Sequence, residues 1–221
     1  MNERSEAEAE DDPHDRFPAG FFSRADETDD AEFYVSDRFV THIDDRAIDA
    51  VGDLYDVLGL TGSVLDLMSS WISHFRVRPR ELVVLGLNRH ELNANPMAHA
   101  VVVQDLNRAA ALPFHDNTFD AVTCCVSIDY LVRPIDVLTE AARVLHPGGT
   151  VVCTFSNRCF PTKVIRGWLS VDEPTRCRVV AEYMRLAGLV EVNVSLRTPH
   201  EGSGDPLYAV VGRSPSRNAT L

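Results

Sequence analysis

Short apolar runs alternate with amphipathic stretches over most of the chain. Five of these runs are expected to be strands: SVLDLM, LVVLGLN, HAVVVQDL, DAVTCCVS and TVVCTFS. Continuous apolar runs of this length are typical of parallel strands that are covered on both faces. Two further strands are expected near the C-terminus, VEVNVSL and LYAVVGR, joined by the turn-rich segment TPHEGSGDP.

The stretches between these runs carry apolar residues at helical spacing. A helix is expected from Asp44 or Asp45 through about Leu58, because Asp caps helix N-termini and Gly59 suits the turn that follows a helix. Further helices are expected in SSWISHF, in RHELNAN, over residues 135–145 and in TRCRVVAEYMRLAGL. Strands that alternate with helices predict an α/β fold with right-handed crossovers.

Length and composition indicate a single domain. The chain has 221 residues, of which 45% are apolar, so it can bury one substantial core. Its net charge is −12, and Lys163 is the only lysine beside twenty arginines, which disfavours binding to a nucleic-acid backbone. This composition fits either adaptation to high salt or GC-rich codon usage.

Four segments differ in composition. Residues 1–15 are acidic and nearly free of apolar side chains, so we expect a disordered tail. Residues 16–60 hold an aromatic-rich stretch, expected to form a lid, and the first helix. Residues 61–213 form the core, and residues 214–221 form a C-terminal tail.

Neither a targeting segment nor a metal site is expected. The start MNERSEAEAEDD lacks the basic and apolar regions of a secretory signal, and no run reaches the roughly 18 apolar residues of a membrane span. The five cysteines form no CxxC pair, which favours a reducing compartment and no zinc site. We therefore expect a soluble cytoplasmic protein with no membrane partner.

The residues after each strand are the candidate site, because ligands of open α/β sheets bind beyond the carboxyl ends of the strands. Asp66 through Ser70 follow the first strand and Asn88 follows the second. Asp105 opens the segment after the third strand, and Ser127 opens the segment after the fourth.

The stretch from Asp105 to Gly149 carries the most specific pattern: QDLN, LPFHDNTFDAVTCCVSIDYL and VLTEAARVLHPGG in uninterrupted order. It resembles the class I S-adenosylmethionine-dependent methyltransferases. The segments FYVSDRFVTHID, LDLMSSWISHF and GLNRHELNANP resemble an atypical subgroup of that fold with no assigned substrate. The resemblance implies a Rossmann-like sheet of seven mostly parallel strands, with an antiparallel last strand and helices on both faces. It also implies S-adenosylmethionine as cofactor and a small-molecule acceptor.

The same resemblance implies a role for each candidate residue. The methionine end of the cofactor would be lined by Asp66, Met68, Ser69 and Ser70, the ribose by Asn88, the adenine by Asp105 with Leu106, and the methyl–sulfur region by Ser127. Asn107 is a further cofactor-binding candidate in the loop of Asp105. Three of these assignments have a structural alternative. Asp66 can organise its loop, Asp105 can cap a turn, and Asn88 can cap the helix that opens at Arg89.

Two positions depart from the pattern of the family. Met68 and Ser69 stand where glycines are usual, and Asn88 stands where an acid normally accepts the ribose hydroxyls. Glu91, one helical turn further on, is a substitute for that acid. A turn with side chains suits a ligand without phosphate better than a dinucleotide, whose pyrophosphate needs bare backbone amides.

Methyl transfer depends on positioning, with a general base where the acceptor carries a proton. Asp129 is the candidate base, with Tyr130 beside the acceptor. After the fifth strand, Asn157 and Arg158, with Lys163, are candidates for holding an anionic acceptor. Asp129 can also cap a helix, and Arg158 can also pair with a carboxylate.

The aromatic-rich stretch supplies the expected lid residues Tyr34, Arg38, His42 and Asp44, although His42 is also consistent with a capping or surface histidine. Two other functions stay open. A noncatalytic binding or scaffold protein would explain the missing glycines and ribose acid. A nicotinamide-dependent dehydrogenase requires a GxGxxG turn, which the first turn lacks.

Overall fold

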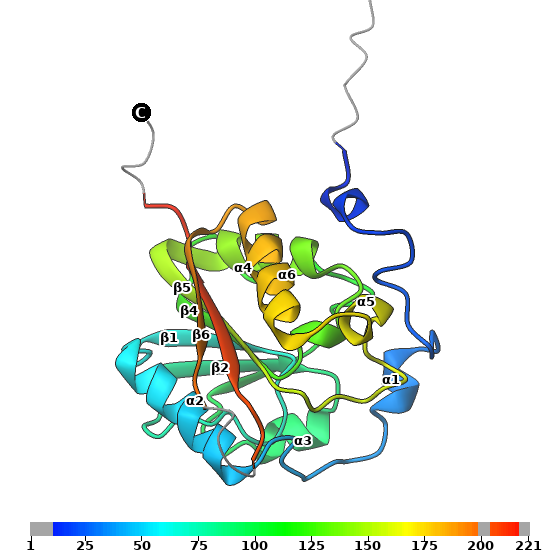
Figure 1. The fold of residues 1–221 in the computed structure, drawn as a ribbon. Coiled ribbons are helices and arrows are strands. Elements are labelled where there is room, and N and C mark those ends of the chain that lie inside the picture. The colour runs from blue at the N-terminus through cyan, green and yellow to red at the C-terminus, as the bar shows by residue number, and fades with distance from the viewer. Residues whose placement is uncertain (1–10, 199–203, 217–221) are drawn as a thin grey trace, which may run out of the picture.

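A single sheet organises the part of the chain that the computed structural model describes, residues 11–198 and 204–216 (Figure 1). Its strands lie in the order β3-β2-β1-β4-β5-β7-β6. They are β1 (Ser63–Leu67), β2 (Glu81–Gly86), β3 (Ala100–Val103), β4 (Phe119–Cys125), β5 (Leu145–Phe155), β6 (Val190–Leu196) and β7 (Tyr208–Arg213). Strands β1 to β5 are parallel, and β7 runs antiparallel between β5 and β6. The predicted sheet is confirmed.

Helices cover both faces of this sheet (Figure 1). One face packs against α4 (Pro134–Val144), α5 (Arg166–Leu169) and α6 (Glu173–Leu186). The other packs against α2 (Asp45–Val57) and α3 (Arg89–Ala94). Leu65 of β1 belongs to the first core and its neighbour Val64 to the second, because successive strand side chains point to opposite faces. Burial on both faces explains why the strands are continuous apolar runs in the sequence.

Helix α2 begins and ends where the sequence predicts. The Asp44 carboxylate accepts a hydrogen bond from the amide of Ala47 at 2.8 Å, which caps the N-terminus. Gly59 follows the helix with a φ of 67°, the left-handed conformation that glycine adopts without strain. Asp172 caps α6 in the same way through the amide of Thr175.

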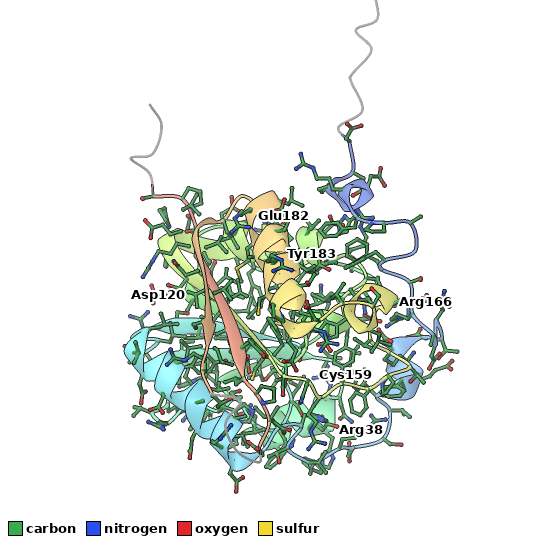
Figure 2. The ribbon with its side chains drawn as sticks, in the orientation of Figure 1. Arg38, Asp120, Cys159, Arg166, Glu182 and Tyr183 are labelled. Atoms are coloured by element: carbon green, nitrogen blue, oxygen red, sulfur yellow. The ribbon has the colours of Figure 1, made fainter. Side chains whose placement is uncertain are left out.

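The N-terminal arm, residues 11–44, runs along the side of the molecule past α5 (Figure 1). Its backbone pairs with the segment before α5: the amide of Gly167 donates to the Phe21 carbonyl at 2.8 Å, and Arg24 forms a β-bridge with Ile165. Phe17 lies 5.2 Å from the ring of Tyr183 on α6, which Figure 2 labels. The arm is thus part of the packed structure.

Order begins earlier than the predicted boundary at residue 16. A 3-10 helix, η1 (Pro13–Arg16), is capped by Asp12, and the buried His14 ring stacks edge-on to Phe22 at 5.1 Å. The remainder of the expected acidic tail, residues 1–10, and the end of the C-terminal tail, residues 217–221, lie outside the described residues. Within the described part, every helix is too short or too polar to cross a membrane.

Candidate functional site

A cavity of about 260 Å³ lies at the carboxyl ends of β1 to β4. The arm and the segment after β5 form its outer wall. Arg38 of the arm and Cys159 of that segment, both labelled in Figure 2, border it. All nine residues expected to contact a cofactor also border it: Asp66, Met68, Ser69, Ser70, Asn88, Asp105, Leu106, Asn107 and Ser127. The structure therefore brings the expected binding residues together around one space, and Met68 and Trp71 do not close it.

The first turn, after β1, reaches a glycine-like conformation without a glycine. Met68 has a φ of 51°, in the left-handed region that costs an L-residue about 1–2 kcal/mol. The amide of Ser69 then donates to the Leu85 carbonyl at 2.8 Å. A Cβ on Gly86 would come within 2.4 Å of the Ser69 carbonyl oxygen. The bare backbone that this turn needs is therefore supplied by β2.

Asp66 organises this turn from within. Its carboxylate is 3% exposed and accepts hydrogen bonds from Ser69 Oγ at 2.6 Å and Thr123 Oγ1 at 2.7 Å. Burial raises its pKa. These contacts match the structural alternative for Asp66, a buried carboxylate that holds its loop, although the residue also borders the cavity.

The helix expected in SSWISHF does not form. The Asn95 side chain donates to the Ser70 carbonyl at 3.0 Å and to Ser73 Oγ at 2.7 Å, which holds the segment in an irregular path. His74 in this segment has a φ of 56°, incompatible with a right-handed helix. Burial, with a smaller contribution from the charge of protonated His42, lowers the pKa of His74 to about 4. Both histidines border the cavity.

Asn88 caps α3, as its structural alternative predicts. Its Oδ1 accepts hydrogen bonds from the amides of His90 at 2.9 Å and Glu91 at 3.2 Å. Its Nδ2 donates to the Tyr34 carbonyl at 3.2 Å and to Asp37 Oδ1 at 2.9 Å. The side chain thus joins the arm to α3, and both ends of its amide already have partners.

Glu91 is the acid beside the Asn88 position. It is 6% exposed, and it borders the cavity. Its Oε1 accepts from the Arg38 amide at 2.7 Å and its Oε2 accepts from Ser70 Oγ at 2.5 Å. Glu91 therefore ties the arm to the first turn while keeping a carboxylate at the place where the sequence lacks the usual ribose acid.

The loop after β3 is held by its own amide groups. Asp105 Oδ1 accepts from the Asn107 amide at 2.8 Å. Burial raises the pKa of Asp105 against the effect of the backbone amides of Asn107 and Arg108. The Asn107 side chain donates to Asp30 Oδ2 at 2.8 Å and to the Tyr130 carbonyl at 3.0 Å. Asn107 is thus a structural link between the arm and the loop after β4.

Ser127 follows β4 at a strained point of the backbone. The preceding residue, Val126, has a φ of 45°, which is rare for a β-branched side chain, and its amide donates to the Thr154 carbonyl at 2.8 Å. Ser127 Oγ donates to the Cys125 carbonyl at 2.7 Å. Strained backbone of this kind concentrates at functional sites.

Asp30 anchors the arm to the core through buried charges. Arg24 Nη1 donates to both of its oxygens at 2.8 Å, and Lys163 Nζ lies 3.2 Å from Oδ1. We call these three residues the Asp30 cluster; all are at least 93% buried. Burial alone would raise the pKa of Asp30, but the hydrogen bonds from Arg24 and Asn107 outweigh it and lower that pKa. Lys163 is engaged here, so it does not fit the expected role of holding an anionic acceptor.

Asp129 does not border the cavity, so the structure does not place it where the expected general base would act. It lies in a 3-10 turn, η2 (Ile128–Tyr130), where successive side chains point about 120° apart. That turn brings Tyr130 to the cavity and leaves Asp129 in the interior, 3% exposed. Desolvation raises the pKa of Asp129 to about 7.

The residues expected to hold the acceptor after β5 are also revised. Asn157 is exposed and away from the cavity. Arg158 borders the cavity, but its Nε pairs with Asp205 Oδ1 at 2.8 Å, as the structural alternative predicts. The lid residue Asp44 likewise does not reach the cavity, because it caps α2 and accepts from the Asp205 amide at 2.7 Å.

An aromatic wall lies on the outer side of the cavity, and the sequence singled out two of its residues, Tyr34 and Tyr130, but not Phe33 and Phe160. We define it as Phe33, Tyr34, Tyr130 and Phe160. Tyr130 OH accepts from the Phe160 amide at 2.8 Å, and their rings are 6.0 Å apart. Burial raises the pKa of both tyrosines far above the ordinary value. The sequence signal that could have identified this wall was Phe160, an aromatic residue in FSNRCFPTK, the segment that follows β5.

Two polar side chains of the arm lie against this wall. The Arg38 guanidinium is 4.6 Å from the centre of the Phe33 ring and 5.8 Å from that of Phe160. The His42 ring is edge-on to Phe160 at 5.4 Å. Tyr34, Arg38 and His42 all border the cavity, the position that the expected lid residues require. The described residues contain no group of three or more His, Cys, Asp or Glu side chains placed to hold a metal ion.

Comparisons with known proteins agree with this geometry. Residues 75–153 match the family described as a methyltransferase domain. A ubiquinone/menaquinone biosynthesis C-methyltransferase from Roseobacter denitrificans is 52% identical over 103 residues, which cover 45% of this chain and 40% of the relative. A demethylmenaquinone methyltransferase from a Mycobacterium species is 43% identical over 77 residues, 33% of each protein. The chain thus matches two fifths or less of the length of these relatives.

Solved structures share the fold at low sequence identity. A methyltransferase from Aquifex aeolicus superposes with a TM-score of 0.55 at 15% identity, covering 84% of this chain and 97% of its own. The methyltransferase in a complex with the Haloferax volcanii Trm112 activator superposes with a TM-score of 0.54 at 19% identity, covering 72% of this chain and 85% of its own. The match extends over most of this chain and supports the strand order described above.

Proposed function

We propose that this chain is a class I S-adenosylmethionine-dependent methyltransferase that transfers a methyl group from S-adenosylmethionine to a small-molecule acceptor. The observation that carries the proposal is the single cavity at the carboxyl ends of β1 to β4, bordered by every residue expected to contact the cofactor. Ligands of open α/β sheets bind at this edge.

The residues at this edge fit the cofactor in a modified way. Asp105 accepts a hydrogen bond from the adenine end of the cofactor, and the first turn around Met68 and Ser69 faces the methionine end. Glu91 takes the ribose in place of Asn88, because the Asn88 oxygen already accepts two hydrogen bonds, whereas each oxygen of the buried Glu91 carboxylate accepts only one and can accept another. The first turn suits this cofactor because S-adenosylmethionine has no phosphate that would need several bare amides.

The residues of the aromatic wall help to position the cofactor and the methyl acceptor. When bound, the cofactor supplies a methyl group on a positively charged sulfur. The faces of Tyr130 and Phe160 favour a cation nearby and exclude water from the outer side of the cavity. Holding donor and acceptor in this dry space accounts for most of the rate in an in-line displacement.

Calorimetric titration with S-adenosylmethionine and S-adenosylhomocysteine tests the cofactor site. We expect the wild type to bind both, and Asp105→Ala to weaken binding by roughly ten- to a hundredfold, the value of a hydrogen bond to a charged group. Asp49→Ala, an exposed carboxylate on α2, is the control and should leave the affinity unchanged. Absence of binding to the wild type would favour a scaffold protein of this fold instead.

A ring of the hydroquinone type is the acceptor that best suits the wall. Planar rings stack on aromatic side chains, and three rings of the wall, those of Tyr34, Tyr130 and Phe160, border the cavity together with the Arg38 guanidinium. The relatives from Roseobacter and Mycobacterium are named for methyl transfer in quinone biosynthesis. An oxidised quinone is electrophilic, so the acceptor of a methyl cation equivalent is its reduced form.

Transfer of radiolabelled methyl to 1,4-naphthalenediol under anaerobic conditions tests this acceptor class. We expect ring methylation by the wild type and a higher KM for the diol in Phe160→Leu, with the affinity for S-adenosylmethionine unchanged. Cyclohexane-1,4-diol, which has the same hydroxyl groups but no flat ring, is the control compound and should not react. Equal methylation of both compounds would contradict the role of the aromatic wall.

A further inference from the structure

Among the described residues, each carboxylate that borders the cavity already has a partner in the protein. Four carboxylates border the cavity, and each already accepts hydrogen bonds or ion pairs from the protein: Asp30, Asp66, Glu91 and Asp105. Asp129, the base expected from the sequence, lies outside it. The side chain that takes the proton from the hydroxyl group of the methyl acceptor is therefore expected to be of another kind.

His42 has the properties that the carboxylates lack. It borders the cavity on the side of the aromatic wall, with its ring 5.4 Å from that of Phe160. Neither ring nitrogen makes a hydrogen bond within the described part of the chain. Although the residue is exposed at the rim of the cavity, partial desolvation lowers its pKa below the ordinary value, so the ring is mainly neutral at pH 7 and a nitrogen lone pair can accept a proton.

The groups that face His42 come from three elements. Glu91 of α3 raises its pKa, and Arg38 of the arm lowers it. His74, from the segment after β1, is close enough for the two histidine charges to repel each other. His74 is the weaker base because its own pKa is about 4, and a base works best when its pKa lies near the working pH.

We propose that His42 is the general base of the methyl transfer, an inference that rests on the proposed function. A ring nitrogen of His42 takes the proton of the acceptor hydroxyl, and the resulting oxyanion increases the electron density on the adjacent ring carbon. That carbon forms a bond to the methyl group as the methyl–sulfur bond breaks and the electron pair stays on sulfur. The ring carbon then loses its hydrogen as a proton to water, and His42 returns its proton to the oxygen.

The test compares His42→Gln with wild type in the transfer of labelled methyl to 1,4-naphthalenediol. We expect kcat to fall by roughly 10²- to 10⁴-fold, the usual contribution of a general base, with the calorimetric affinity for S-adenosylmethionine within about twofold of wild type. His115→Gln, an exposed histidine away from the cavity, is the matched control and should keep the wild-type kcat.

Two further readouts separate a base from a packing residue. The wild-type kcat/KM should increase with pH as His42 loses its proton. This rising limb of the pH profile should be absent in His42→Gln. In His42→Gly, added imidazole should restore part of the lost rate. A kcat of His42→Gln equal to wild type, or a pH limb that persists in it, would overturn the base while leaving the proposed function intact. A wild type that binds the cofactor but does not methylate the diol would overturn the acceptor class and the base together.

Discussion

Gly86 lies directly against the carbonyl group of Ser69, and a Cβ on Gly86 would come within 2.4 Å of that oxygen. The end of β2 and the first turn are therefore in backbone contact. In a glycine-rich version of this turn the small residues would lie on the turn itself; here the small residue is on the neighbouring strand.

Replacing Gly86 by alanine should push the first turn outward. We expect a loss of stability of about 1–3 kcal/mol from overpacking, together with weaker binding of S-adenosylmethionine, because Ser69 borders the cavity. Thermal unfolding and calorimetry measure the two effects. Gly148→Ala is the control: its φ of 79° costs stability, yet nothing lies within 4 Å of its Cβ and it does not border the cavity. Its cofactor affinity should stay at the wild-type value, and an equal loss of affinity in both variants would contradict this account.

Asp129 should make stability depend on pH. Its folded-state pKa of about 7 lies above the ordinary 3.8, so the folded state holds the proton more tightly than the unfolded state. Below pH 3.8 the carboxyl is protonated in both states and costs nothing. The free energy of unfolding then decreases as the pH rises from 3.8 to about 7 and is constant above about pH 7. The total decrease is on the order of 4 kcal/mol.

Asp129→Asn should therefore stabilise the protein, and more strongly at pH 8 than at pH 5, in urea unfolding at both values. Asp49→Asn, which removes an exposed carboxylate, should change stability little at either pH. A difference between Asp129→Asn and wild type that is the same at both pH values would show that the buried carboxyl is not the titrating group.

The Asp30 cluster should be intolerant of losing its carboxylate. Asp30→Asn leaves the buried cations of Arg24 and Lys163 without their charge partner, and breaking a buried ion pair costs about 3–5 kcal/mol. Urea unfolding measures the loss. Asp29→Asn, whose partner Arg108 is exposed, should cost less than about 1 kcal/mol. Comparable losses in the two variants would contradict the importance of burial here.

The sequence predicts the parts of this fold that depend on local pattern. Both faces of each parallel strand are buried, so the strands are visible as apolar runs, and Asp44 and Gly59 mark the ends of α2 by their own backbone preferences. The prediction of a helix around Ser70 and Ser73 failed because the path of this segment depends on a distant side chain, Asn95, which no local pattern reveals.

The candidate site was predictable only in its location. The ends of the strands identify which loops meet, and all the residues expected to contact the cofactor do border one cavity. The direction of each side chain within a loop was not predictable. Asp129 and Tyr130 are neighbours in one short turn, yet only Tyr130 reaches the cavity. Whether a polar residue is still free also depends on partners far along the chain, as Arg158 and Asp205 illustrate.

The docking of the N-terminal arm has a consequence for biosynthesis. Phe17 and Phe22 are synthesised before Tyr183, which both of them pack against and which follows only after about 160 further residues have been made. At 5–20 residues per second the delay is roughly ten to thirty seconds. Throughout that interval these rings remain without their final neighbours, so the nascent chain is a natural client for chaperones that shield apolar side chains.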